Sequence, residues 1–418
     1  MKKNKIYISL MSVCFLFAVG LVRAQDNYED GCIRCHQEQD MMPEGFEKYD
    51  IHLQAGLSCA GCHGGNPNTD DEDVAMSVKA GFKGVPQKKD ISKLCGKCHS
   101  NIDFMRIYQP RIPTDQVDQY YSSTHGQKLI TGDKKVADCT SCHSTHKILG
   151  AHDSRSTVHA FKVPGTCNVC HGDAEYMKGY NLSTDQYKDF EKSVHGVALL
   201  ENEDRGAPAC NDCHGNHGAK PPGVRSVGHV CGTCHVNNMQ YFTTSPMNDV
   251  FEDMGYHACE ECHGKHAVHK TSDEMTGLGE KSTCVKCHDA SDTGGEVALK
   301  IHENIRQVVT TLDSAEISRA EVQKVGMDDV EMSFLMQEAH QNLIQARTLV
   351  HTFDADKVAE KTVAGVDLAR NALNLAQTEI DEYGTRRRGF GYATLFITIL
   401  AIALFFKIRD MEAAKKKK

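Results

Sequence analysis

Apolar residues recur with helical spacing in the last third of the chain. A first stripe advances in alternating steps of four and three residues and consists of Ile301, Ile305, Val308, Leu312 and Ala315. A second stripe follows Gly326 and consists of Leu335, Ala339, Leu343, Ala346 and Val350. A third segment, from about residue 357 to about residue 382, is rich in Ala, Leu and Val. This periodicity predicts three helices that pack as an antiparallel bundle over residues 293–388.

Both ends of the chain carry uninterrupted apolar runs. Residues 6–21 follow three lysines and precede a small residue at Ala24, which is the pattern of a secretory signal peptide at 1–24, with an uncleaved anchor helix as the alternative. Residues 389–407 are long and apolar enough for one transmembrane helix, with a buried core helix as the alternative. Three arginines precede this run and six Lys or Arg residues lie at or after its end, so residues 408–418 are predicted to form a cytoplasmic basic tail. The rest of the mature chain is then expected in the periplasm, held at the cytoplasmic membrane by a single pass.

Residues 25–292 have a different character, because cysteine and histidine dominate them. The whole chain has 19 Cys, 23 His and no Trp. Eighteen cysteines lie outside the signal peptide and form nine pairs with two residues between the members, and a histidine follows every pair. The nine motifs are Cys32/Cys35/His36, Cys59/Cys62/His63, Cys95/Cys98/His99, Cys139/Cys142/His143, Cys167/Cys170/His171, Cys210/Cys213/His214, Cys231/Cys234/His235, Cys259/Cys262/His263 and Cys284/Cys287/His288.

Three kinds of chemistry use cysteine pairs of this spacing, and the histidine separates them. Structural zinc takes two pairs per metal and does not need an adjacent histidine. Disulfides suit an exported protein but leave the histidine unexplained. C-x-x-C-H is the attachment motif of c-type haem, in which two thioethers hold the porphyrin and the histidine binds the iron. The motifs therefore predict nine haem c groups, with the nine adjacent histidines as proximal ligands.

This count also explains the shortage of large apolar side chains. Aromatic residues make up 7% of the chain, so something other than the polypeptide has to fill the interior of residues 25–292. Stacked porphyrins would supply that interior. The fold class expected is a multihaem cytochrome c, mostly α-helix and loop wrapped around haems, followed by the helical bundle and one transmembrane helix.

The haem motifs belong to an internal repeat. Thr114-Asp115-Gln116 leads to Ser123-Thr124-His125-Gly126, and Thr184-Asp185-Gln186 leads to Ser193-Val194-His195-Gly196 at the same offset. Each stretch reads as a short helix capped by Thr and stopped by Gly. Two motifs follow each stretch, the first of which ends in C-H-x-x-H. We call these units module two (114–171) and module three (184–235). A looser copy, module one (52–99), precedes them, and module four (245–288) follows, so one haem plus four di-haem modules make nine.

Histidines outside the motifs are candidates for the distal side of the irons. Position in the repeat selects an upstream set, a C-H-x-x-H set and others near a motif or on the bundle. The candidates are His52, His125 and His195, then His146, His217 and His266, and finally His257, His340 and His351. Met247 stands in module four where the upstream histidine is expected. It either binds iron, which would raise that haem's reduction potential, or packs while His257 takes the role.

The net charge argues against nucleic acid as a partner. The chain carries a formal charge of −9, and removal of a signal peptide with four positive residues and no acids would take it to −13. A nucleic-acid-binding protein needs a basic surface instead.

Taken together, the chain resembles the membrane-anchored periplasmic multihaem c-type cytochromes of anaerobic respiration. The pattern S-x-H-G followed by C-x-x-C-H-G-x-H is similar to repeats of the pentahaem and decahaem electron carriers, and the helical tail resembles that of the hydroxylamine-oxidoreductase group. All nine motifs end in histidine, whereas nitrite reductases of that group carry one lysine ligand. The resemblance implies electron transfer between a quinol-oxidising membrane complex, of cytochrome b/Rieske type or similar, and a periplasmic redox partner. An oxidoreductase acting on a small nitrogen or sulfur compound at an open haem is the alternative, and whether the chain is itself an enzyme stays open.

Overall fold

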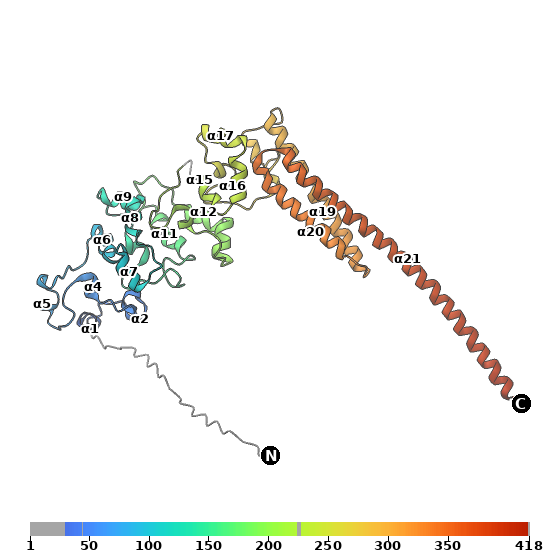
Figure 1. The fold of residues 1–418 in the computed structure, drawn as a ribbon, viewed down its shortest axis with the longest axis horizontal. Helices are drawn as coiled ribbons and strands as arrows, with labels where there is room; N and C mark the ends of the chain where they lie inside the picture. The colour runs from blue at the N-terminus through green and yellow to red at the C-terminus, as the bar shows by residue number, and fades with distance from the viewer. Residues whose placement is uncertain (1–29, 44, 224–226, 417–418) are drawn as a thin grey trace, which may run out of the picture. The chain divides into compact units, whose positions relative to one another are not determined.

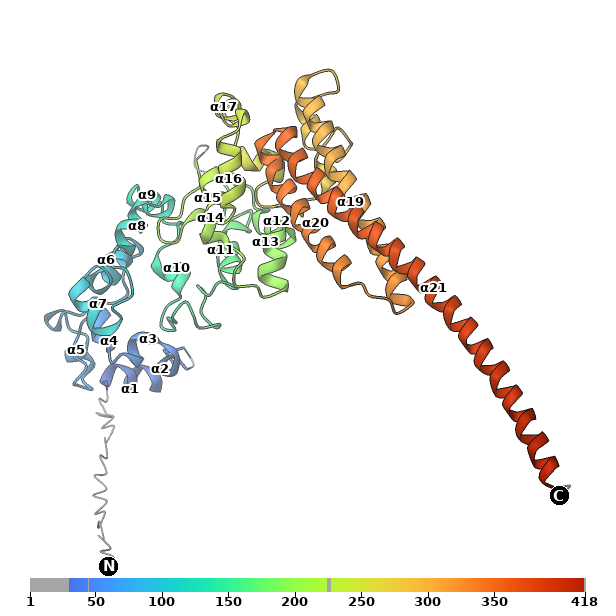
Figure 2. The same cartoon turned by 45° about the vertical axis from the view of Figure 1, so that its right-hand side comes forward.

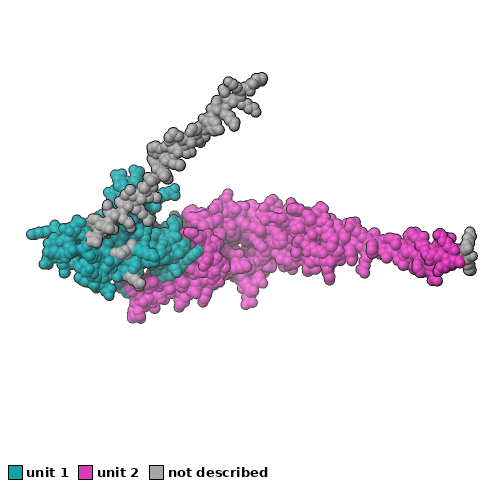
Figure 3. Space-filling model, turned by 90° about the horizontal axis from the view of Figure 1, so that it is seen from below, with its two compact units in different colours: residues 1–166, 216–219 teal, residues 167–215, 220–418 magenta. Residues whose placement is uncertain are grey.

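A computed structural model describes residues 30–43, 45–223 and 227–416. The predicted signal peptide lies outside these residues. The part described consists of helices and turns and contains no strand (Figures 1 and 2). It divides into two compact units, one of residues 1–166 with 216–219 and one of residues 167–215 with 220–418 (Figure 3). The first unit holds four C-x-x-C-H motifs, and the second holds five together with the helical bundle.

Short helices separated by turns make up the first unit. They are α1 (Gly31–Glu38), α2 (Phe46–Tyr49), α3 (Ile51–Gln54), α4 (Cys59–His63), α5 (Glu72–Ala75), the 3₁₀ turn η1 (Val78–Ala80), α6 (Lys88–His99), α7 (Ile102–Tyr108), α8 (Gln116–Ser122), α9 (Thr124–Ile130) and α10 (Cys139–His143). The helix α11 (Val163–His171) begins at the end of this unit.

The second unit begins with short helices and turns and ends with three long helices. Its short elements are α12 (Gln186–Lys192), α13 (Val194–Gly196), the π-helical turn η2 (Val197–Glu201), α14 (Cys210–His214), α15 (Val227–Gly232), α16 (Val236–Thr243), α17 (Pro246–Asp253), α18 (Ala258–His263), η4 (Asp273–Met275) and η5 (Cys284–Lys286). Its long elements are α19 (Thr293–Lys324), α20 (Val330–Leu349) and α21 (Ala355–Lys416), with the 3₁₀ turn η6 (Val350–Thr352) between the last two.

The three predicted bundle helices are confirmed. Every member of the first stripe is buried, and α19 ends at Lys324, just before Gly326 with a positive φ of 72°. The second stripe packs into the same core, with Ala339, Leu343 and Ala346 buried. Both α19 and α20 pack mainly against the first part of α21. Burial of these apolar side chains is therefore what holds the bundle together.

Most of the buried apolar side chains lie in this bundle. Few lie between residues 30 and 292, where the main examples are Phe46, Tyr120, Leu129, Leu199 and Phe242. The polypeptide of the motif-bearing region thus supplies little apolar core of its own, in line with the scarcity of aromatic residues in the sequence.

The helix α21 runs without interruption from the bundle to the C-terminal tail. It has 62 residues, and its last buried residue is Ala376. Its C-terminal part contains a stretch apolar and long enough to cross a membrane, and the side chains of that stretch are not buried in the protein. The sequence predicted a bundle helix and an apolar helix at 389–407, and the structure joins them into one.

The stretch upstream of each motif pair differs from its prediction. Asp115 and Asp185, rather than the preceding threonines, occupy the N-cap positions of α8 and α12. These helices end at Ser123 and Ser193, which cap the next helices, α9 and α13. Gly126 lies inside α9 and Gly196 closes the single turn of α13. A serine cap therefore breaks each predicted helix in two, because its hydroxyl accepts a hydrogen bond from the glycine amide.

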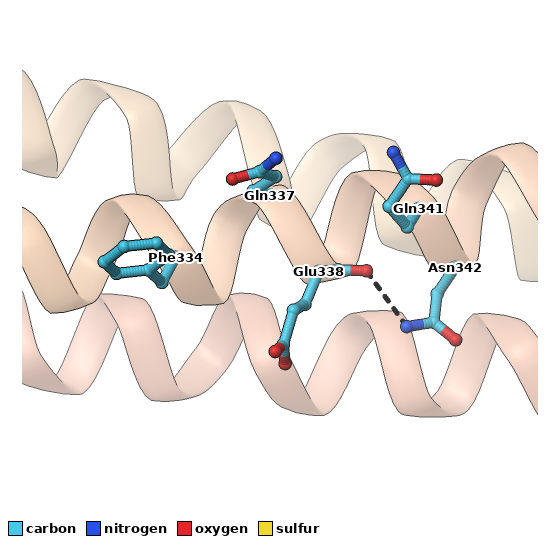
Figure 4. A pocket seen from close by; sticks show the side chains of 5 residues that line it. All are labelled: Phe334, Gln337, Glu338, Gln341 and Asn342. Atoms are coloured by element: carbon cyan, nitrogen blue, oxygen red, sulfur yellow. Dashed lines mark hydrogen bonds between the residues drawn. The ribbon is translucent and has the colours of Figure 1, made fainter.

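A shallow hollow lies on the outer face of α20. It is lined by Phe334, Gln337, Glu338, Gln341 and Asn342, and the Asn342 side chain donates a hydrogen bond of 3.0 Å to the Glu338 carbonyl (Figure 4). No cysteine or histidine contributes to this lining. The candidate functional residues are instead the cysteines and histidines of the C-x-x-C-H motifs.

Candidate haem sites

Each C-x-x-C-H motif forms a turn or the end of a helix, so that its two sulfurs and its imidazole project from one short segment. The first motifs of the four modules form α4, α10, α14 and the body of α18. Hydrogen-bonded caps fix several of these turns. Asp138 accepts hydrogen bonds from the amides of Thr140 and Ser141 at the start of α10, and the Asp212 carboxylate accepts one from the Ala209 amide beside α14. These hydrogen bonds thereby hold the motifs in a fixed local conformation.

The second cysteine of a motif is held differently from one motif to the next. Cys142 is exposed, whereas Cys35 and Cys170 are half-buried. The side-chain amide of Gln39 approaches the Cys35 sulfur at 3.4 Å, which places that sulfur beside the end of α1. The Cys142 carbonyl accepts a hydrogen bond from the Thr157 hydroxyl, and the Cys170 carbonyl accepts one from the Asp173 amide at 3.1 Å.

These contacts distinguish only in part between zinc binding, disulfide formation and haem attachment at the cysteines. Among the described residues, the eighteen motif cysteines form no disulfide with one another, Cys35, Cys142 and Cys170 included. The disulfide alternative therefore has no support in the structure. Thioether attachment of haem at Cys35, Cys142 and Cys170 stays a prediction, which rests on the C-x-x-C-H pattern and on the imidazole next to each pair.

Six motif histidines lie opposite a histidine from outside the motifs, with ring planes that range from nearly parallel to nearly perpendicular. The ring-centroid separations are 6.1 Å for His52–His99, 6.1 Å for His63–His146, 6.1 Å for His143–His217, 6.3 Å for His195–His235, 6.0 Å for His214–His266 and 6.0 Å for His263–His351. The six values differ by 0.3 Å although the pairs come from different elements. Ring packing alone allows a wider spread of separations, about 4.5–7 Å, so a nearly constant value at different ring tilts indicates a common object between the rings.

An iron ion with two axial imidazoles fits this gap. A metal–imidazole bond of about 2.0 Å on each side, plus about 1.1 Å from each nitrogen to its ring centre, gives about 6.2 Å between the centroids. The six pairs therefore have the spacing of a bis-histidine metal centre. Each pair contains one histidine adjacent to two cysteines, which is the donor set that haem c requires.

Burial favours the neutral form of several of these imidazoles, which is the form that binds a metal. It lowers the pKa of His99, His143 and His217, with neighbouring histidines as a further cause for the first two. The effect is largest at His263, where burial and then the nearby His351 lower the pKa to about 4. A nitrogen lone pair is thus available at these rings at neutral pH.

The C-H-x-x-H histidines reach back into the preceding module. His146 of module two faces His63 in module one, His217 of module three faces His143 in module two, and His266 of module four faces His214 in module three. In every case the histidine that it faces belongs to the first motif of the earlier module. Neighbouring modules are therefore interlocked, each completing a site in the one before.

A main-chain hydrogen bond repeats at each of these junctions. The amide of the residue before the upstream histidine donates to the carbonyl two residues after the C-H-x-x-H histidine of the next module. The three copies are Ile51 to Ile148 at 2.9 Å, Thr124 to Ala219 at 3.0 Å and Val194 to Val268 at 2.8 Å. This recurrence shows that the modules repeat in three dimensions as well as in sequence.

Module four has no module after it, and the bundle takes that place. The first motif of module four contains His263, and the ring opposite it belongs to His351. His351 lies in η6, where its Nδ1 atom is 2.9 Å from the Thr348 carbonyl. That contact occupies Nδ1, so Nε2 is the ring nitrogen left for a metal. The helical bundle thus replaces the missing fifth module.

The upstream histidines face the second motif of their own module. His52 of α3 faces His99, and His195 of α13 faces His235. His125 occupies the corresponding position in α9, two residues after the Ser123 cap. Of the remaining candidates, His340 is exposed on α20, and His257 begins α18 with its Nδ1 atom 3.3 Å from the Glu260 carboxylate.

The Nδ1 atoms of three motif histidines have partners that orient the ring. His63 lies 2.9 Å from the Gly84 carbonyl, and His214 lies 3.3 Å from the Lys220 carbonyl. His288 instead lies 2.8 Å from the Asp292 carboxylate. Hydrogen-bonded main-chain amides, Asp289 first, lower the pKa of Asp292 to about 2. Its Oδ1 also accepts the Gly295 amide and caps α19. Sequence reasoning missed this aspartate, although an Asp four residues after a motif histidine and before a helix is a detectable signal.

Asp30 joins the first two motifs of the chain. It is 4% exposed, and its carboxylate accepts hydrogen bonds from the Cys32 amide at 2.9 Å and the Cys59 amide at 3.3 Å. One buried side chain therefore caps α1 and also holds the start of α4.

Replacement of Asp30 by alanine is expected to lower the free energy of unfolding of this region by about 1–2 kcal/mol, because both amides lose their acceptor. Chemical denaturation followed by helical circular dichroism would measure the loss. Glu38, exposed at the other end of α1, provides the control, since its replacement by alanine removes an acid without removing a cap. Equal effects of the two substitutions would contradict the assignment.

Sulfurs of successive motifs also lie next to one another. The thiols of Cys95 and Cys139 are hydrogen-bonded, as are those of Cys167 and Cys210 and those of Cys231 and Cys259. Electrostatic neighbours supply the other links, with Cys32 beside Cys59, Cys62 beside Cys95 and Cys98, Cys213 beside Cys231 and Cys234, and Cys262 beside Cys284 and Cys287. Within each unit, every motif therefore interacts at least electrostatically with the motif that follows it in the sequence.

The geometry is the one expected of a protein with covalently attached haem and histidine-ligated iron. A comparison with protein families agrees, because residues 51–171 match the family model for cytochrome c3. The matched range covers modules one and two. It supports a multihaem c-type cytochrome that binds haem c and transfers electrons. No curated protein and no solved structure matches the chain significantly.

Proposed function

We propose that the chain carries nine c-type haems and conducts electrons between two redox partners. The observation that carries this proposal is the set of six imidazole pairs with centroid separations of 6.0–6.3 Å, each beside a pair of cysteines. The cysteines would hold the porphyrins by thioether bonds, and the paired imidazoles would bind the iron. Haem iron then supplies reversible one-electron chemistry, while the polypeptide fixes spacing, ligands and potentials.

The contacts between sulfurs support a sequential path within each unit. In the first unit they connect the motifs of Cys32, Cys59, Cys95 and Cys139 in that order. In the second unit they connect the motifs of Cys167, Cys210, Cys231, Cys259 and Cys284 in that order. Because each thioether sulfur would be bonded to a porphyrin substituent, sulfurs that lie near one another would bring two porphyrin edges close together. Electrons are expected to move between sequence neighbours.

The location and the partners belong to the same proposal. The apolar part of α21 would anchor the protein, the motif-bearing units would lie in the periplasm, and residues 408–418 would lie in the cytoplasm. The donor would be a quinol-oxidising membrane complex, of cytochrome b/Rieske type or similar, and the acceptor a periplasmic redox protein. Anaerobic respiration is the setting that this arrangement fits.

The first test is a count of haems and a redox titration. Protein produced with the cytochrome c maturation machinery is expected to contain nine haems per chain by pyridine haemochrome absorbance against protein mass. A titration is expected to give several overlapping one-electron steps, most of them low, as is usual for bis-histidine ligation. Fewer than nine haems, or only potentials too high to accept electrons from quinol, would contradict the proposal.

A second candidate function is an oxidoreductase that acts on a small nitrogen or sulfur compound. One observation favours it, because among the described residues no second imidazole lies against His36. An iron bound by that histidine alone would accept a substrate. High-spin signals in the ferric electron paramagnetic resonance (EPR) spectrum, together with turnover of nitrite or hydroxylamine, would favour this function over simple conduction.

A further inference from the structure

The start of α17 reproduces the local fold that carries the upstream histidines. Ser123, Ser193 and Ser245 have φ/ψ of −72°/162°, −71°/163° and −88°/157° at the N-caps of α9, α13 and α17. All three are buried. Each hydroxyl donates to the carbonyl three residues earlier, at 2.6, 2.6 and 2.7 Å. Module four therefore keeps the turn that presents the upstream residue, although its sequence there is Ser-Pro-Met-Asn.

The residue two positions after each serine is the one that the turn presents. It is His125 in module two, His195 in module three and Met247 in module four. His195 faces His235, which belongs to the second motif of its own module, and His52 faces His99 under the same rule. The rule assigns Met247 to the second motif of module four, which contains His288.

His288 is the motif histidine of the second unit that needs such a partner. No second imidazole lies against it among the described residues, whereas His214, His235 and His263 each have one. Its ring is nevertheless fixed in place. The Asp292 carboxylate holds Nδ1 at 2.8 Å, and a Cβ atom added to Gly294 would come within 2.3 Å of the ring. The site thus has a well-held proximal imidazole and lacks a distal one.

We propose that the Met247 sulfur is the distal iron ligand opposite His288. This inference rests on the proposed function, since it needs haem at Cys284 and Cys287. Methionine is a softer ligand than imidazole and favours Fe²⁺, so this haem has a higher reduction potential than a bis-histidine haem in the same surroundings. Asp292 is a positioning residue here, because its hydrogen bond orients the His288 ring and increases its basicity.

The position of the site in the repeat explains why it differs. In modules one to three, the residue before the upstream histidine donates its amide to the next module. In module four that residue is Pro246, which has no amide hydrogen. The junction to a further module is therefore absent in module four, and the terminal copy is free to use a different ligand. The last haem of the second unit would therefore have a reduction potential different from those of its bis-histidine neighbours.

The test compares spectra of the haem-loaded, full-length protein with those of Met247→Leu and Met247→His variants. The wild-type ferric protein is expected to show the weak far-red absorbance band of a methionine–Fe³⁺ bond. Both substitutions are expected to abolish the band. Met247→His is also expected to lower the midpoint potential of one haem and to keep that haem low-spin, because it restores the ligand found in the other modules.

Two control variants separate ligation from packing. Met254, 55% exposed at the end of the same helix, can be replaced by leucine, and His257, the competing ligand, by alanine. Both are expected to keep the far-red band. Nine haems without the band in wild type, or a band lost in His257→Ala and retained in Met247→Leu, would overturn the inference while leaving the proposed function intact. A chain that binds no haem would instead refute the proposed function itself.

Discussion

Replacement of His351 by alanine is expected to convert one haem in nine from low-spin to high-spin iron. His351 lies 6.0 Å from His263 and is the only imidazole that the described residues place opposite that ring. Its loss leaves an open coordination position on a partly buried site. We expect a high-spin ferric EPR signal of one haem per chain and binding of one carbon monoxide per chain after reduction.

His340 provides a matched control for this substitution. It lies on α20, the helix that ends just before His351, but it is exposed and, within the described part of the chain, faces no motif histidine. His340→Ala is expected to leave the spectra unchanged. His351→Ala is also expected to weaken the attachment of the bundle to the motif-bearing region. After the substitution, one polar connection that remains from α20 to that region is the exposed Arg347–Asp273 ion pair at 2.7 Å. Unchanged spectra in His351→Ala would rule out this residue as the ligand.

Replacement of Gly196 by alanine is expected to lower the free energy of unfolding by about 3 kcal/mol, near the upper end of single-substitution effects. An added Cβ atom would lie 1.9 Å from the Phe190 carbonyl oxygen and 2.8 Å from the Glu191 Cα atom. Both are main-chain atoms, so α12 and α13 would have to separate. His195 would then move away from His235, and a high-spin haem signal should accompany the loss of stability.

The control for Gly196→Ala is the same substitution at Gly165. Gly165 lies in α11, and no heavy atom would come within 4 Å of its added Cβ atom. Alanine is expected to stabilise the protein there by about 0.5–1 kcal/mol through lower backbone entropy of the unfolded chain. Thermal unfolding with absorbance at the haem band would compare the two variants. A Gly196→Ala protein as stable as wild type would show that the junction tolerates a wider separation.

Features that depend on residues close in sequence were predictable. The bundle stripe from Ile301 to Ala315 follows helical periodicity, and the structure buries it as a unit. The cysteine motifs are likewise local, because attachment and proximal ligation both arise within five residues. The break at Ser123 was missed because a Ser cap inside a short helical stretch competes with continuation of the helix, and only the hydrogen bonds to Gly126 and Tyr120 decide between them.

Contacts between modules were not predictable from single motifs. His217 was a distal candidate because of its place in the C-H-x-x-H pattern, but that pattern does not reveal its partner, His143, which is 74 residues away in the preceding module. The 11-residue spacing of His340 and His351 would place them on one face of a continuous helix. That reasoning fails once α20 ends at Leu349, since His351 lies in the following turn and Phe353 then adopts a left-handed φ of 52°. Helical periodicity holds only while the helix continues.

The length of α21 sets a minimum reach for any electron donor in the membrane. The helix begins at Ala355, next to η6 and His351, and the proposed membrane span begins at Gly389, 34 residues later. At about 1.5 Å per residue, that distance is about 51 Å along the helix. A quinol confined to the bilayer therefore cannot touch the iron held by His263 while α21 stands upright. Under the proposed topology, a donor to that iron would need a redox centre that projects tens of ångströms from the membrane.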